Sequence, residues 1–240
     1  MMRLDEHKTT QPTEPLKAAR RLENLIGRDE ELQTIENIFT SLEGPAVFYL
    51  EGPGGIGKTA LSQAARARLE GQGYVVKDLV DLYHIEHQSR VGIIQSIVRN
   101  LDEEIFTEYR KTYGRLQKKR AGEAKVAETD WQELWTAFQN DLEHHSEQKP
   151  VLIALDTTEV LGYEQDRFHR DMGLEPPEFT VGKWLVDTII LQSRGRVLWL
   201  LSGRSADHTL YDHLTYAQGA NISLHRLEIR PLDTQASRQY

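Results

Sequence analysis

Apolar residues recur along the chain with two different spacings. Between residues 32 and 42 they fall three or four positions apart, which is the spacing of one face of an amphipathic helix. Four later segments share this spacing: 61–69, 91–101, 131–142 and 181–189. Short segments rich in β-branched and other apolar residues instead predict strands. These segments are 46–50, 74–80, 151–155, 197–201 and 221–229.

The predicted strands alternate with the predicted helices, and several strands are apolar on both faces. This pattern is typical of an α/β fold in three layers, with a parallel sheet of about five strands covered by helices on both faces. The charge-rich stretch 103–128 is expected to be helical. Thr129, followed three positions later by Gln132, predicts the amino-terminal cap of the next helix.

The ends of the chain differ from its middle. Residues 1–20 are polar and charged and are expected to form a flexible lead-in, whereas residues 21–230 carry the predicted strands and helices. Pro231 and Asp233 are typical of a helix start, so residues 231–240 are interpreted as the beginning of a truncated helix. We therefore expect the sequence to be a fragment of a longer protein.

Composition excludes several classes of function. The 240 residues include 29 Lys and Arg against 37 Asp and Glu, and the net charge of −8 disfavours a protein that coats nucleic acid. The absence of cysteine excludes disulfides, thiolate catalysis and Cys-ligated metals. No apolar run approaches the roughly 20 residues of a membrane span, and the start of the chain lacks the apolar segment of a secretion signal. These features predict a cytoplasmic protein with no membrane partner.

A phosphate-binding motif lies between the first predicted strand and the next helix. Residues 52–59 read Gly-Pro-Gly-Gly-Ile-Gly-Lys-Thr, which matches G-x-x-x-x-G-K-[ST]. In such a P-loop, backbone N–H groups surround the phosphates, Lys58 adds a positive charge, and the Thr59 hydroxyl can bind Mg²⁺. The alternative is a glycine-rich turn with an accidental lysine. The predicted nucleotide-binding residues are Gly52, Gly54, Gly55, Ile56, Gly57, Lys58, Thr59 and Ala60.

Acidic residues follow the third predicted strand. Asp156 ends the apolar run 151–155, where it could hold Mg²⁺ together with Thr59, although it could instead cap the following turn. The adjacent position, where a second acid usually orients water, is Thr157. The nearest carboxylate is Glu159, which is either a catalytic base or an acid favoured by a helix dipole.

An arginine follows the fourth predicted strand. Arg204 ends the sequence Ser202-Gly203-Arg204 and is expected at the same sheet edge as the P-loop and Asp156. It could contact the γ-phosphate through charge-assisted hydrogen bonds, or it could be a surface residue of a turn. Asp156, Glu159 and Arg204 are therefore the candidate catalytic residues, and Thr59 and Asp156 are the candidate metal ligands.

Together these motifs resemble the nucleotide-binding module of STAND-type ATPases, the NACHT and NB-ARC relatives of the AAA+ class. The resemblance rests on Leu25-Ile26-Gly27-Arg28-x-x-Glu31-Leu32, the P-loop, the Asp156 strand and the strand end at Arg204. It implies that Leu25, Ile26 and Gly27 flank the adenine, that Arg28 lies near the nucleotide, and that Arg204 is a sensor arginine. It also implies that residues 231–240 begin a helical lid. Thr157 departs from the family pattern and predicts slow turnover.

The function expected from the sequence is that of an ATP-binding and slowly hydrolysing switch within a larger signalling or sensor ATPase. Its cofactors are ATP or ADP and Mg²⁺, and its partners are other domains of the full-length protein and further copies of the chain when it is activated. The rival is an AAA+ ATPase that acts on nucleic acid through Lys111, Arg115 and Lys118–Arg120. We interpret this basic segment as a solvated helix face and do not expect nucleic acid as a partner. A scaffold that binds no nucleotide is a third, disfavoured reading.

Overall fold

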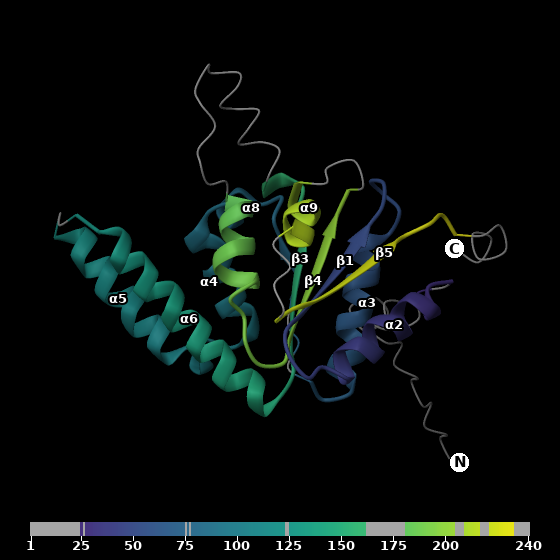
Figure 1. The fold of residues 1–240 in the computed structure, drawn as a ribbon, viewed down its shortest axis with the longest axis horizontal. Coiled ribbons are helices and arrows are strands. Elements are labelled where there is room, and N and C mark those ends of the chain that lie inside the picture. Colours follow the sequence, from purple (N-terminus) through teal and green to yellow (C-terminus); the bar gives the residue numbers. More distant parts are fainter. Residues whose placement is uncertain are drawn as a thin grey trace, which may run out of the picture.

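A computed structural model describes most of the predicted α/β region. The residues that it describes are 25, 27–74, 76, 78–122, 125–161, 181–204, 209–216 and 221–232. Their five strands form one parallel sheet in the order β2-β3-β4-β1-β5 (Figure 1). The strands are β1 (Ala46–Glu51), β2 (Val80–Asp81), β3 (Val151–Asp156), β4 (Val197–Gly203) and β5 (Ser223–Glu228). The predicted parallel sheet of about five strands is thus confirmed.

Alternate residues of the central strands face two separate hydrophobic cores. On one face, Phe48 and Leu200 pack in a core with α2 (Asp29–Thr40) and α3 (Lys58–Gly71). On the other face, Tyr49 and Trp199 pack with residues of several helices. These helices are α4 (Arg90–Leu101), α5 (Thr107–Ala121), α6 (Glu128–Gln148), α8 (Val181–Trp184), a π-helical segment (Leu185–Ile190) and α9 (Thr209–Tyr216). The two cores give the three layers that strands apolar on both faces predict.

The helices α5 and α6 form a long pair that projects from the sheet (Figure 1). The predicted helix within 103–128 is present as α5, which follows a short 3₁₀ turn at Glu103–Ile105. Three ion pairs involve the basic residues of α5: Lys111 with Glu108 at 3.5 Å, Arg115 with Glu133 at 2.5 Å, and Lys119 with Asp130 at 2.5 Å. Three of the five basic residues therefore have an acidic partner on α5 or α6.

One prediction about secondary structure is confirmed only in part, and another is wrong. Among the described residues of the expected strand 74–80, only Val80 lies in the sheet, where it forms β2 with Asp81 and pairs with β3. Thr129 does not cap α6, because the helix already begins at Glu128. The backbone N–H of Ala127 is satisfied instead by the Asp130 carboxylate at 2.7 Å. The predicted helix start at Asp233 lies outside the described residues.

Candidate functional site

The predicted P-loop joins β1 to α3 at the carboxyl edge of the sheet. Gly57 is the residue before α3 and has a φ of 100°, and Gly55 has a φ of 78°. L-residues with a side chain rarely adopt this left-handed backbone, which explains the need for glycine at both positions. Gly52 is constrained differently, since a Cβ there would lie 3.0 Å from Ile56 Cγ2 and 3.1 Å from the Ile229 carbonyl oxygen.

Lys58 is the first residue of α3 and returns toward the start of the loop. Its Nζ donates hydrogen bonds to the carbonyl oxygens of Gly52 at 2.8 Å and Pro53 at 3.0 Å. Burial lowers the pKa of Lys58 from its ordinary value, while the nearby carboxylates of Glu159 and Asp156 act in the opposite direction. The lysine is thus a partly desolvated cation, which attracts an anionic ligand more strongly than an exposed lysine would.

The two candidate metal ligands, Thr59 and Asp156, are in contact, although the strands that precede them, β1 and β3, are not neighbours in the sheet. The order of the sheet places β4 between β1 and β3. Thr59 Oγ1 nevertheless donates a 2.5 Å hydrogen bond to Asp156 Oδ2. The other carboxylate oxygen, Oδ1, accepts a hydrogen bond from the Ser202 hydroxyl, so Asp156 is held from two sides. A threonine hydroxyl beside a buried carboxylate is a donor set suited to Mg²⁺.

Ser202 was not among the predicted site residues. The sequence did contain a signal, because Asp156 and Ser202 each follow an apolar run. The register of β3 with β4 ends at Leu155 beside Leu201, and the next residue on each strand belongs to the site. If the ends of these two strands are assumed to be neighbours, the sequence predicts that Ser202 lies beside Asp156.

The ends of β3 and β4 remain connected beyond the sheet. The backbone N–H and the hydroxyl of Thr158 donate to the Ser202 carbonyl oxygen at 2.9 and 3.1 Å. One step further out, Arg204 Nε lies 3.1 Å from Glu159 Oε1. The Glu159 side chain is only 13% exposed, and its second oxygen, Oε2, is buried without a hydrogen-bond partner. This unsatisfied acceptor is suited to bind a proton donor such as water.

The Glu159–Arg204 pair lies beside the P-loop. A Cβ placed on Gly54 would lie 3.6 Å from an Arg204 guanidinium nitrogen. Glu159 and Arg204 also both influence the pKa of Lys58 through their charges. The structure therefore brings together the P-loop and all three candidate catalytic residues, Asp156, Glu159 and Arg204.

Thr157 occupies a strained position between the two acidic residues. Its φ is 60°, which is rare for a β-branched residue and costs about 1–3 kcal/mol. Its hydroxyl lies 3.5 Å from an oxygen of Asp81, which pairs in register with Asp156 on the neighbouring strand. The turn after Asp156 is thereby shaped to bring Glu159, rather than residue 157, toward Arg204.

The segment before α2 supplies the remaining candidate residues. Leu25 packs in the core with α2 and α3, and Gly27 has a φ of 72°. Arg28 is 6% exposed and reaches the P-loop at the carbonyl oxygen of Ile56, at 3.4 Å. Ile26 lies outside the described residues. A cavity of about 630 Å³ separates this segment from the end of β5, and its lining includes Gly27, Arg28, Thr34, Leu227, Arg230 and Leu232.

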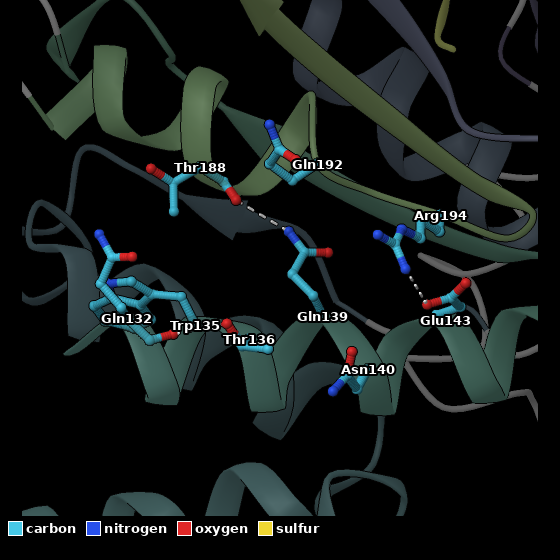
Figure 2. Close-up of a pocket in the computed structure, with 9 residues that line it drawn as sticks. All are labelled: Gln132, Trp135, Thr136, Gln139, Asn140, Glu143, Thr188, Gln192 and Arg194. Atoms are coloured by element: carbon cyan, nitrogen blue, oxygen red, sulfur yellow. Dashed lines mark hydrogen bonds and ion pairs between the residues drawn. The ribbon is translucent and has the colours of Figure 1, made fainter. Parts of the chain in front are cut away.

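A second cavity lies away from the P-loop, between α6 and the π-helical segment (Figure 2). It has a volume of about 300 Å³ and is lined mainly by amide and hydroxyl side chains. One of these, Gln139, donates to the carbonyl oxygens of Thr188 and Ile189, at 3.2 and 2.7 Å. These carbonyls lie near the end of the π-helical segment, so Gln139 helps to cap it. None of the candidate nucleotide-binding or catalytic residues lines this cavity.

No group of three or more His, Asp or Glu side chains is arranged to hold a metal ion in the part of the chain that the structure describes. None of the helices placed by the structure has the length and apolar character needed to cross a membrane.

Comparison with solved structures gives matches of low sequence identity. The AMPPCP-bound DnaA from Aquifex aeolicus is 15% identical, with a TM-score of 0.38, and the match covers 90% of this chain and 51% of DnaA. A structure described as the basis for katanin self-assembly is 14% identical, with a TM-score of 0.44, and the match covers 97% of this chain and 65% of that one. The chain therefore spans between about half and two thirds of these proteins.

Comparison by sequence is more specific. None of the curated proteins matches the chain significantly. The family profile described as the AAA ATPase domain matches residues 24–169 of the 240, a range that contains the P-loop, Asp156 and Glu159. Because this match covers more than half of the sequence, the chain belongs to the AAA ATPase domain family.

Proposed function

We propose that the chain is an ATP-binding and slowly hydrolysing switch module of a larger STAND-type signalling or sensor ATPase. The observation that carries the proposal is the meeting of Lys58, Thr59, Asp156, Glu159 and Arg204 at one edge of the sheet. Membership of the AAA ATPase domain family supports nucleotide binding. The STAND assignment is supported by the sequence resemblance and by the location of Arg204 beside the P-loop.

The residues at this edge fit a nucleotide with its metal ion. The P-loop N–H groups and Lys58 would hold the phosphates, and Thr59 with Asp156 would hold Mg²⁺. When bound, the metal ion supplies charge neutralisation at the phosphate oxygens. The cavity beside Gly27 and Arg28 is large enough for a nucleobase, and its position matches the adenine site that the resemblance implies.

Two features support slow hydrolysis. Thr157 replaces the usual second acid, so Glu159 is the carboxylate nearest to Asp156 in sequence that can accept a proton from the attacking water. Glu159 is also ion-paired with Arg204, so its Oε1 is already engaged by a cation. A γ-phosphate would compete with Glu159 for Arg204. Arg204 could therefore distinguish a triphosphate from a diphosphate, as a switch requires.

The first experiment identifies any nucleotide that accompanies the purified protein and then titrates the nucleotide-free protein with Mg-ATP and Mg-ADP. We expect binding of both, with slow release of phosphate. Light scattering in each nucleotide then tests assembly, which we expect to be greater with ATP. An absence of nucleotide binding would refute the proposal. If the protein binds nucleotide but hydrolyses it rapidly at steady state, the proposed role as a switch is wrong and only a nucleotide-hydrolysing activity remains.

A further inference from the structure

We infer that Arg28 is a positioning residue that fixes the P-loop to the end of β5, and that it does not read the base. The inference rests on the proposed function and concerns how its phosphate site keeps its shape. The resemblance implies only that Arg28 lies near the nucleotide. The contacts of the side chain give it a more specific role.

Arg28 joins three separate segments of the chain. Its Nη1 donates to Glu31 Oε1 at 2.8 Å, within the first turn of α2. Its Nη2 donates to the carbonyl oxygen of Arg230 at 2.7 Å and to that of Ile56 at 3.4 Å. Ile56 lies inside the P-loop, and Arg230 follows β5 by two residues. A guanidinium can serve three acceptors in different directions because its five N–H donors lie in a rigid fork.

Burial leaves little of Arg28 free to contact a ligand. The residue is 6% exposed, and both terminal nitrogens of its guanidinium already donate hydrogen bonds. A buried cation without partners would be strongly destabilising, and here Glu31 supplies the compensating charge. The geometry is that of a structural link rather than of a side chain poised to read a base.

Independent contacts tie the same two segments together. The backbone N–H of Ile229 donates to the carbonyl oxygen of Glu51 at 2.7 Å, immediately before the P-loop. The Glu51 carboxylate also pairs with Arg226 Nε at 2.5 Å, although Glu51 is only 4% exposed. Gly52 lies against the Ile229 carbonyl. The start of the loop is therefore fixed to β5 by Glu51, and its middle by Arg28.

This arrangement predicts what the loss of Arg28 would change. A lysine at position 28 keeps the positive charge beside Glu31, but its single ammonium group lacks the rigid fork with which the guanidinium reaches Glu31, Ile56 and Arg230 in different directions. The P-loop would then be less constrained, and every nucleotide that binds through its phosphates would be weakened by the same factor. A residue that contacts the base would instead change the preference for one base over another.

The test compares Arg28→Lys with Arg66→Lys. Arg66 lies on α3 and pairs with Glu70 and Asp78, at 3.4 and 3.5 Å, and not with the P-loop. Hydrogen exchange in the absence of nucleotide should become several-fold faster in Arg28→Lys within two peptides, one covering residues 52–57 and the other residues 227–232. In Arg66→Lys both peptides should exchange as in the wild type. If Arg28→Lys accelerates only one peptide, or neither, the inference is wrong.

A nucleotide titration separates the inference from the proposed function. Affinities for Mg-ATP, Mg-GTP and Mg-CTP should all fall about ten-fold in Arg28→Lys, because a less constrained P-loop has to be ordered when the phosphates bind. Their ratios should remain as in the wild type. A selective loss of ATP affinity would show that Arg28 reads the base. Wild-type protein that binds no nucleotide would refute the proposed function, while the exchange measurement would still decide the role of Arg28.

Discussion

Arg204 Nε lies 3.1 Å from Glu159 Oε1, so the residue proposed to contact the γ-phosphate also holds the acid proposed to activate water. The two residues follow neighbouring strands, and Thr158 fixes the spacing between those strand ends through its two bonds to the Ser202 carbonyl. Recognition of phosphate and hydrolysis are thus connected through one ion pair. A substitution of Arg204 should therefore alter hydrolysis, and a substitution of Glu159 should alter the recognition of phosphate.

Replacing Lys58 tests the phosphate site directly. Lys58→Ala removes a partly buried cation from the P-loop, and we expect the affinity for Mg-ATP to fall by roughly 10- to 150-fold. Calorimetric titration measures the change. Lys118→Ala, which removes an exposed cation from α5, is the control and should bind as the wild type does. Unchanged affinity in Lys58→Ala would contradict the assignment of the site.

Glu159→Gln tests the proposed base. The substitution keeps the shape of the side chain but removes its capacity to accept a proton, so we expect steady-state phosphate release to fall by about 100-fold or more. ATP affinity should not fall, because Arg204 becomes fully available to the nucleotide. Glu147→Gln, at the exposed end of α6, controls for the loss of a carboxylate. Turnover that is fast and insensitive to Glu159→Gln would exclude this role.

Thr157→Gly tests the strain after Asp156. Glycine adopts a φ of 60° without steric cost, which should outweigh its greater entropy in the unfolded chain. We expect a gain of about 1 kcal/mol, or a rise in melting temperature of about 2–4 °C. Thr136→Gly, on the exposed face of α6, should instead lower stability by about a few tenths of a kcal/mol, the difference in helix propensity between threonine and glycine. A loss of stability in Thr157→Gly would mean that the side-chain contact with Asp81 dominates.

The pH dependence of stability should include a contribution from His145. Burial lowers the pKa of His145 in the folded protein, with the charges of Lys149 and His144 acting in the same direction and that of Asp102 opposing them. The unfolded chain therefore binds more protons between the folded pKa and the ordinary value of about 6.5. This contribution favours the folded state above pH 6.5 and is lost as the pH falls. Chemical denaturation at pH 7 and pH 5 should show a smaller loss in His145→Leu than in the wild type. An equal loss in both proteins would contradict this.

Binding to nucleic acid tests the rival function. The net charge of −8 and the ion pairs of Arg115 and Lys119 with acidic residues of α6 leave few cations available for phosphates. We expect weak and salt-sensitive binding of DNA or RNA in an electrophoretic shift assay at physiological salt. Tight binding that disappears in the triple alanine variant of Lys118, Lys119 and Arg120 would favour the nucleic-acid ATPase instead.

The parts of the fold that sequence predicted well depend on local patterns. The apolar run 151–155 predicted a buried strand, and the G-x-x-x-x-G-K-[ST] motif predicted a loop between a strand and a helix. Each of these signals depends only on residues that are close together in the sequence. The placement of Asp156 beside the P-loop also followed, since the carboxyl ends of parallel strands share one edge of the sheet.

The parts that sequence did not predict depend on tertiary register. The hydrogen bond from Ser202 to Asp156 requires knowledge that β4 lies beside β3. The contacts of Arg28 with the carbonyl oxygens of Ile56 and Arg230 join residues 28 and 202 positions apart in sequence, and no spacing rule connects them. Likewise, the basic residues of α5 looked unpaired in sequence, because their partners Asp130 and Glu133 belong to the next helix.

The insertion of β4 between β1 and β3 sets how this protein can tolerate changes in length. Neighbouring strands lie about 4.8 Å apart, so β1 and β3 are separated by roughly 10 Å, and the P-loop and the start of α3 carry Thr59 past the end of β4 to Asp156. A residue added or deleted near Ser202 would shift the strand end that supports this crossing. Helices α5 and α6 carry none of the candidate site residues. Natural variants should therefore differ in length at the tip of that helix pair and keep the length of the segment from Val197 to Arg204 constant.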